Sequence, residues 1–370
     1  MRRPTAVIGG AALASYAWTC CAFVSPSSSQ FAGPTARWDR STATARSSSS
    51  SSNGRSPTMA LKGLARKAKE AQVSKDMEEL RSEQPDSPVF KYLEQAEAGS
   101  GAGDGPEYPL SAVLRKNKGT LSVVAEYRKI LKSGFIDGIL APELLCPLLR
   151  NGGATCIAVA TEPQTGGCSD TDMARVVQEQ ENSRGDFPGP MPVIVRDLVI
   201  SEFEVARAKA AGAAGVTVVL ALVGPERAAE LAAFCKKLGM EAVIQTTSQE
   251  EIEQAAASGD VSIISVVGKT VEEAAELRQY IPESAVSVVH VDRRSDECLD
   301  EIEDCWQLRD AGYHTIWASE VLYKGGMNQA ESAEAIIKAI RAKASVKYGR
   351  ARGMSGKGEG AKEYLGYLAQ

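Results

Sequence analysis

The side chains best suited to chemistry in this chain stand where short apolar runs end. Carboxylate and imidazole groups can take up or release a proton, and arginine binds carboxylate or phosphate through paired N–H donors. Gathered around one opening, such groups would suit an anionic ligand, although the solvated ends of ordinary strands would look the same. The residues concerned are Glu126, Arg128, Arg196, Gln245, Lys269, His290, Ser319 and Glu320.

Composition excludes several classes of function. The 370 residues include 47 acidic and 42 basic ones, so we expect no broad electrostatic surface for nucleic acid. There are only 2 histidines, which excludes a His-rich metal site. His314 stands at the start of its apolar run, where we expect a structural role. The 8 cysteines form no CxxC pair, which predicts reduced, buried thiols and no zinc site.

Apolar, β-branched runs alternate with helix-like segments from residue 121 onward. The runs show no clean polar alternation, which is typical of parallel strands buried on both faces. Eight strand–helix units predict an α/β fold, a (β/α)8 or TIM barrel, with the active site at the carboxyl ends of the strands. An open doubly wound sheet is the competing fold, but no G-x-G-x-x-G follows an early strand. The runs span 121–127, 155–161, 192–200, 215–223, 241–247, 261–267, 285–291 and 314–321.

Segments outside the predicted barrel differ in composition. Residues 59–80 have the pattern of a charged amphipathic helix, so 59–120 is interpreted as an N-terminal helical extension and linker. The barrel is expected over 121–345. Residues 346–370 are rich in Gly and Lys and carry Tyr and Leu near their end, which predicts a flexible tail.

The leader is a basic segment ahead of an acidic body. Residues 1–58 hold six Arg and one Asp, a net charge of +5, whereas the whole chain carries −5. Residues 1–24 have the charged start and apolar middle of a signal peptide, and 25–58 have the Ser-rich, acid-poor composition of a transit peptide. In this order the two segments resemble a bipartite presequence, which predicts import of the protein into the plastid, to the chloroplast stroma. After the presequence is removed, we expect no stable membrane span. A poorly ordered secretory tail is the alternative.

Several segments, in order, resemble the indole-3-glycerol phosphate synthase family. The resemblance covers about 59–345 and implies a TIM barrel of tryptophan biosynthesis. Such a lyase decarboxylates a carboxyphenylamino-deoxyribulose phosphate and closes its ring to an indole, without metal or organic cofactor. The segments that carry it are GLARKAKE (63–70), SVVAEYRK (122–129), GGATCIAVATEPQTGGCSDTDMARV (152–176), PVIVRDLVISEFEVARAKAAGAAGV (192–216), LGMEAVIQTTSQEEI (238–252) and AGYHTIWASEVLY (311–323).

The chain departs from the family pattern at most positions that the resemblance marks as catalytic. Arg128 and Arg196 stand where the family has lysines, and Gln245 and His290 stand where it has glutamates. The Ser-Pro-Ser loop of the family is replaced by KILKSGF (129–135). Lysine can act as a proton donor after its pKa is lowered, but arginine keeps its proton in proteins. Loss of one acid–base group costs about 10²–10⁴ in rate.

Three hypotheses remain open at this stage. An active synthase would use Glu126, Arg128, Arg196 and His290 for catalysis. It would bind its anionic phosphosugar-type substrate through the remaining polar residues, which are Gln245, Lys269, Ser319 and Glu320. A non-catalytic paralogue would instead serve as a binding or scaffold subunit, with a plastid protein partner at the 346–370 tail. A changed reaction on another anionic phosphosugar is the third.

Overall fold

The computed structural model describes residues 57–98, 109–132, 134–135, 141–294, 298–323, 329–342 and 345. The predicted signal segment 1–24, nearly all of the predicted transit segment 25–58, and the predicted tail 346–370 lie outside these residues. Within the described part, no helix combines the length and apolar character needed to cross a bilayer.

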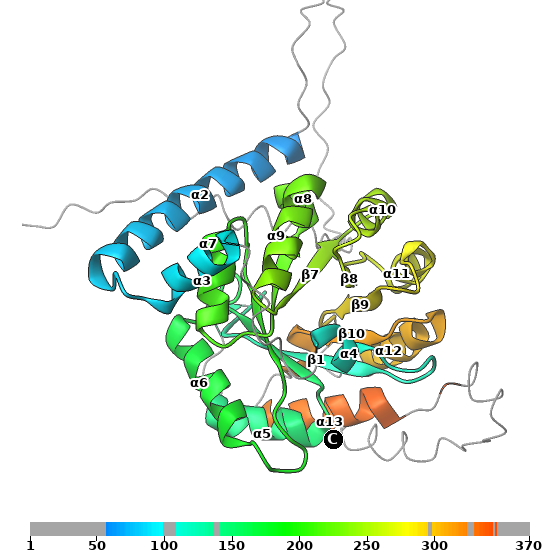
Figure 1. Ribbon diagram of the computed structural model, residues 1–370. Helices are drawn as coiled ribbons and strands as arrows, with labels where there is room; N and C mark the ends of the chain where they lie inside the picture. The colour runs from blue at the N-terminus through cyan, green and yellow to red at the C-terminus, as the bar shows by residue number, and fades with distance from the viewer. Residues whose placement is uncertain are drawn as a thin grey trace, which may run out of the picture.

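Eight parallel strands close into a barrel, in the order β1-β10-β9-β8-β7-β6-β5-β4 (Figure 1). This confirms the predicted (β/α)8 fold. Each strand lies within one of the predicted apolar runs. A strand of a closed parallel barrel is buried on both faces, so its residues are apolar throughout. The strands are β1 (Ser122–Tyr127), β4 (Cys156–Ala160), β5 (Val193–Arg196), β6 (Gly215–Val219), β7 (Glu241–Thr246), β8 (Ile263–Val266), β9 (Val286–Val291) and β10 (Thr315–Ala318).

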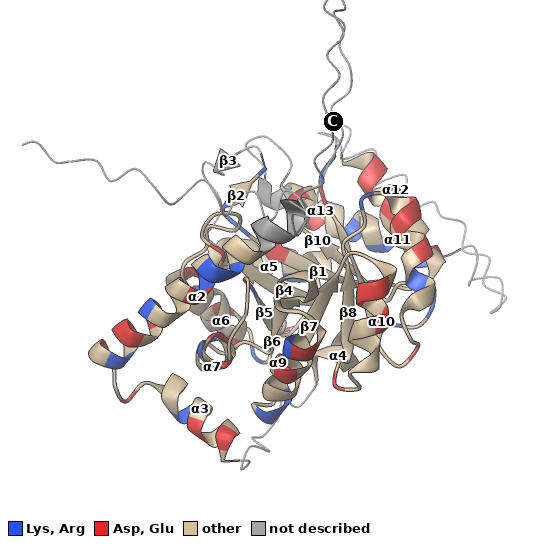
Figure 2. Cartoon of the chain, turned by 90° about the horizontal axis from the view of Figure 1, so that it is seen from above, with Lys and Arg blue, Asp and Glu red and all other residues tan. Residues whose placement is uncertain are grey.

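Helices surround the strands in a ring that Figure 1 shows, and Figure 2 shows the same barrel turned by 90°. Their ends follow local signals: Ser169 and Asp172 form a capping box, and Gly312 ends its helix with a φ of 107°. The main helices are α5 (Pro142–Gly152), α6 (Asp170–Asn182), α7 (Glu202–Ala210), α9 (Pro225–Lys237), α10 (Gln249–Ala257), α11 (Val271–Leu277), α12 (Leu299–Ala311) and α13 (Gln329–Ala342). The short ones are α8 (Leu220–Val223), η1 (Arg278–Tyr280) and η2 (Glu320–Leu322), so the predicted strand at 215–223 is wrong in its second half.

Three helices precede the barrel, where the sequence predicted one: α2 (Pro57–Glu83), α3 (Pro88–Glu97) and α4 (Leu110–Leu114). The short α4 closes the amino end of the barrel, where Leu110 and Leu114 join the inner core. The hydroxyls of Ser122 and Thr315 donate to the carbonyl of Leu114, at 2.8 and 3.1 Å. The barrel interior is therefore sealed at this end.

Helix α2 lies along the barrel beside α7 and α8 (Figure 1). Its Lys69 ammonium is 2.8 Å from an Asp197 carboxylate oxygen and 3.2 Å from one of Glu204. Val73 of the same helix packs against the apolar cluster of Val89, Phe203 and Ala206. Burial of both an apolar side chain and a paired charge fixes α2 on the barrel.

Side chains along each strand alternate between two cores. In β1, Val123 and Ala125 belong to the outer core under the helices, whereas Val124 belongs to the inner core. Because successive strand residues point to opposite faces, Glu126 shares the inner side with Val124. After β1 the chain forms a small hairpin, β2 (Ile130–Leu131) and β3 (Gly134–Phe135).

Candidate functional site at the barrel mouth

The carboxyl ends of the strands meet at one end of the barrel, which we call the mouth. Inward-facing positions there carry polar groups instead of the aliphatic ones found deeper in the barrel. Strand register pairs Trp317 with His290 and Gln245 with Ser265. Parity therefore brings side chains from β1, β5, β7, β8, β9 and β10 to a common centre, and the residue that β8 contributes is Ser265, not the predicted Lys269.

Glu126 lies at the centre of the mouth and is 1% exposed. One carboxylate oxygen, Oε2, accepts hydrogen bonds from Arg196 Nη1 and from Trp317 Nε1, the latter at 2.7 Å. The other, Oε1, is 3.4 Å from Arg128 Nη1 and has no hydrogen-bond partner within the protein. The carboxylate is thus held by two guanidinium groups and one indole.

Arg128 ties three chain segments together. Its Nε donates to the Ile130 carbonyl at 2.7 Å, and its Nη2 donates to the Thr165 carbonyl at 2.6 Å. Its Nη1 donates to Ser319 Oγ at 2.9 Å and lies 3.4 Å from Glu320 Oε1. A guanidinium offers five N–H donors in a fixed plane. Here each of its nitrogens already has a protein partner.

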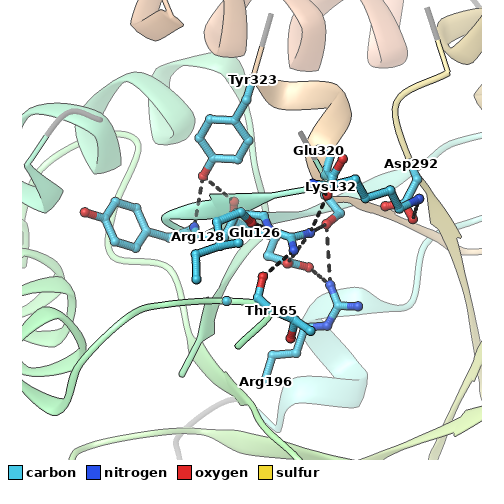
Figure 3. A network of polar contacts seen from close by, with 12 residues as sticks. Glu126, Arg128, Lys132, Thr165, Arg196, Asp292, Glu320 and Tyr323 are labelled. Carbon is cyan, nitrogen blue, oxygen red and sulfur yellow. Dashed lines mark hydrogen bonds and ion pairs between the residues drawn. The ribbon is translucent and has the colours of Figure 1, made fainter. Parts of the chain in front are cut away.

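Two further carboxylates and a lysine complete the mouth network (Figure 3). Glu320 Oε1 accepts a hydrogen bond from the Lys132 backbone N–H at 2.8 Å. The Lys132 ammonium lies 3.2 Å from Asp292 Oδ2. We use the name mouth network for Glu126, Arg128, Lys132, Arg196, Asp292 and Glu320. Its three cations and three carboxylates cancel one another within the network.

Arg196 keeps its positive charge although it is buried. Removal from water lowers the pKa of its guanidinium to about 10, although the Asp292 and Glu320 carboxylates oppose that shift. The group therefore stays protonated at neutral pH. Its guanidinium carbon also lies 5.7 Å from the centre of the Trp317 ring, a cation–π distance.

His290 sits against the same indole. Its ring stacks on Trp317 with centroids 4.8 Å apart and planes at 21°, and its Nε2 is 2.8 Å from Ser265 Oγ. Burial, helped by the nearby Arg196 charge, lowers the pKa of His290 to about 3. The imidazole is neutral at physiological pH and holds its hydrogen bond to Ser265 in that form.

The remaining sequence-predicted residues fall in different places. Gln245 is 4% exposed at the end of β7. Lys269 is exposed, and its backbone N–H donates to Glu273 at the start of α11, so it lies at the rim and outside the mouth network. His314 lies at the opposite end, with Nδ1 2.8 Å from Ser287 Oγ.

Sequence reasoning did not single out Trp317, Lys132, Thr165 or Ser265. Trp317 is fully buried at the centre of the barrel, where it touches Glu126, Arg196 and His290 at once. Strand parity could have found it, since it stands two residues before Ser319. The carbonyl of Thr165 gave no signal, because any residue type supplies one.

Two cavities lie elsewhere in the molecule. One of about 70 Å³ lies under α2, beside Lys69, Asp197 and Arg207. The other, of about 580 Å³, lies at the amino end of the barrel beside Arg309 and Arg341. No side chain of the mouth network lines either cavity.

Metal and disulfide chemistry find no support in the described part of the chain. No group of three or more His, Cys, Asp or Glu side chains there could hold a metal ion. The six cysteines of the described residues are free and buried.

The chain is similar in sequence to known indole-3-glycerol phosphate synthases. It is 28% identical over 229 residues to the indole-3-glycerol phosphate synthase of Carboxydothermus hydrogenoformans, an alignment that covers 58% of this chain and 81% of that relative. Indole-3-glycerol phosphate synthase 2 of Ralstonia nicotianae is 30% identical over 147 residues, covering 39% of this chain and 50% of its own. A solved structure titled "Native KDPGal structure" aligns with 60% of this chain and 93% of its own, at a TM-score of 0.43 and 14% identity.

The family model described as indole-3-glycerol phosphate synthase matches residues 71–278, which is more than half of the chain. This match begins within α2 and covers strands β1 to β8, and thus includes Glu126, Arg128, Arg196 and Gln245. The chain belongs to the indole-3-glycerol phosphate synthase family of tryptophan biosynthesis.

Proposed function

We propose that this chain is a non-catalytic member of its family, a TIM barrel that serves as a binding or scaffold subunit and does not close the indole ring. The observation that carries the proposal is the partnering of Arg128 and Arg196. Both guanidinium groups are directed at protein atoms: Glu126 and Ser319 for both, and Thr165 for Arg128. They fill the positions where the resemblance implies lysines.

Ring closure needs a proton donor and a proton acceptor with pKa values near the working pH. Arg196, with a pKa of about 10, and His290, with a pKa of about 3, are both far from neutrality in opposite directions. Gln245 cannot accept a proton as a glutamate would. The charge balance of the mouth network further disfavours an anionic substrate.

Turnover assays test the proposal. The purified chain is given the carboxyphenylamino-deoxyribulose phosphate, and indole formation is followed by fluorescence. We expect no product above background from the wild type. The triple variant Arg128→Lys, Arg196→Lys, Gln245→Glu restores titratable groups, and we expect about a 10²-fold gain or more.

A matched control makes the same three kinds of change elsewhere. Arg175 and Arg227 are surface arginines paired with Glu143 and Glu202, and Gln178 is exposed on α6. The triple variant Arg175→Lys, Arg227→Lys, Gln178→Glu should stay inactive. Indole formation by the wild type above the uncatalysed background would refute the proposal.

One observation favours a second candidate, an active enzyme with Glu126 as proton acceptor. Glu126 Oε1 is buried and has no hydrogen-bond partner within the protein, so it can take a proton or hydrogen bond from a ligand. Slow wild-type turnover that Glu126→Gln abolishes, with the fold retained, would favour this candidate.

We also propose that the chain works in the plastid, with its partner bound through the 346–370 tail. The composition of residues 1–58 supports the first part, and the aromatic and aliphatic end of the tail supports the second. A reporter fused after residue 58 should enter plastids, and removal of 25–58 alone should strand it in the secretory route. Affinity capture with and without 346–370 tests the tail, and identical partner sets would count against it.

A further inference from the structure

The larger of the two cavities lies at the amino end of the barrel, on the face opposite the mouth. Its volume of about 580 Å³ falls within the range of about 300–1,000 Å³ that small-molecule sites occupy. Its walls come from residues 119–121 ahead of β1, from the end of α5 and from the last turns of α13. In size, the cavity can therefore admit a small molecule.

The side chains that line this cavity are positively charged. Arg309, Lys338 and Arg341 contribute to its wall, and none of the described lining residues is acidic. Two of the three cations have a carboxylate close by: Arg309 Nε lies 2.9 Å from Asp310 Oδ1, and Lys338 pairs with Glu334. Arg341 is exposed and makes no hydrogen bond or ion pair with the described part of the chain. The cavity thus has one cation more than these two carboxylates balance.

Arg341 does not serve the helix that carries it. It stands in the last turn of α13, where an arginine commonly binds the final carbonyls of its own helix. Its guanidinium instead lies against the end of α5, a helix that packs beside α13 (Figure 1). Gly153 ends α5 with a φ of 90°, and a Cβ at this position would overlap Arg341 Nη1. The absence of a side chain at position 153 therefore gives the guanidinium its place at the cavity.

The chain's own outlying segments do not suit this cavity. Residues 1–58 carry a net charge of +5, and residues 346–370 hold five Lys or Arg and two Glu. A basic segment would be repelled by the cationic wall. A guanidinium matches two oxygens of one carboxylate or phosphate group through paired N–H donors. The suitable occupant is therefore a separate molecule that carries such a group.

We propose that the cavity at the amino end is a second binding site, which takes a small anionic molecule through a carboxylate or phosphate group bound to Arg341. Lys338 and Arg309 add to the positive charge of its wall. No residue of the mouth network lines this cavity, so the site does not depend on whether the mouth closes an indole ring.

Citrate and inorganic phosphate are the two probes, and thermal unfolding of the full chain at constant ionic strength is the measurement. We expect at least one probe to raise the melting temperature of the wild type, and the probe that does so distinguishes a carboxylate from a phosphate site. At ten times the dissociation constant, the folded-to-unfolded ratio should rise about elevenfold. Arg341→Gln should weaken binding by roughly 10-fold to 150-fold, because a hydrogen bond to a charged group is lost.

Two glycine variants test the position of the guanidinium without changing its charge. Gly153→Ala fills the space that Arg341 occupies. Gly259→Ala is the matched control, because Gly259 also has a left-handed φ, of 67°, but no heavy atom within 4 Å of an added Cβ. Both variants strain the backbone, but only Gly153→Ala should lose the response to the probe. Arg175→Gln removes an exposed arginine outside the cavity and should respond like the wild type.

The outcomes decide the proposal in both directions. Equal stabilisation of the wild type and Arg341→Gln would overturn it, because the probe would then bind elsewhere. A wild type that responds to neither probe would also overturn it. If Arg341→Gln does not fold, the comparison of Gly153→Ala with Gly259→Ala decides alone. Loss of the response only in Gly153→Ala supports the site, and equal responses refute it.

Discussion

Replacement of Lys69 by Met should release α2 from the barrel. The Lys69 side chain is 8% exposed, and its partners Asp197 and Glu204 are 14% and 10% exposed, so the ion pairs are buried. Although burial alone would lower it, these two carboxylates hold the pKa of Lys69 above its usual value. Loss of one member of a buried ion pair costs about 3–5 kcal/mol.

The lower end of that range applies here. Asp197 keeps a hydrogen bond from the Leu198 N–H at 2.6 Å, and Glu204 keeps one from the Ile200 N–H at 2.8 Å. A loss of about 3 kcal/mol corresponds to roughly a 150-fold change in the docking equilibrium, at 1.36 kcal/mol per factor of ten. Amide hydrogen exchange along 65–83 should therefore accelerate by about 100-fold in Lys69→Met, while exchange in the barrel strands stays unchanged.

The defect should also depend on pH. Burial raises the pKa of Glu204, and Lys69 opposes that shift. Without the lysine the folded state binds a proton on Glu204 more readily than the unfolded state does. The loss of stability in Lys69→Met therefore becomes smaller as the pH falls through the folded-state pKa of Glu204, by up to about 1.4 kcal/mol per pH unit.

Lys75→Met is the matched control, because Lys75 is an exposed lysine on the same helix. It should exchange like the wild type at every pH. If Lys69→Met and Lys75→Met behave alike, or if the Lys69 variant exchanges faster throughout the barrel, the reasoning on the buried pair is refuted.

Three further predictions concern the mouth and the histidines. Glu126→Gln leaves Arg196 without its carboxylate and should lower the free energy of unfolding by about 3 kcal/mol in denaturant titrations, and a loss under about 1 kcal/mol would contradict this. Trp317→Ala should cost about 3–5 kcal/mol, because it empties the barrel centre and removes an N–H from Glu126, and a near-neutral result would show that the interior collapses to fill the space. Burial lowers the pKa of His290 to about 3 and that of His314 to about 4, so neither ring should titrate between pH 5 and 8 by NMR. Because the unfolded histidines bind protons first, stability should fall as the pH drops below about 6.5, and a flat profile would argue against these depressed values.

The sequence was sufficient to predict the barrel because its signals are local. Strands are indicated by apolar runs, of which four to six residues pair in the barrel. Helix ends are indicated by glycines such as Gly312. Neither signal depends on distant parts of the chain. The second half of 215–223 was misassigned because Leu220–Val223 is as apolar as a strand, and periodicity cannot separate the two over four residues. Helix α4 was missed because five residues are too few to show a period.

The sequence predicts where the site lies but not which side chains contact one another. Strand parity puts Glu126, Arg196 and His290 at one opening, and that requires only the count of residues along each strand. The partner of each group depends on loop paths that no period encodes. Arg128, for example, donates to a carbonyl 37 residues away in the chain. Lys269 was placed among the binding residues because it ends a strand, whereas its backbone instead caps the next helix.

The cross-linked character of the mouth network has a consequence for how its side chains can be exchanged. Arg128 is shared by Glu126 and Glu320, and Glu320 in turn holds Lys132. Replacing Arg128 by the lysine that the family resemblance implies would keep the charge but lose the planar set of donors that now serves the Ile130 and Thr165 carbonyls at once. A change at any one member of the mouth network therefore disturbs contacts in several loops at once, so its side chains can be exchanged only in combination.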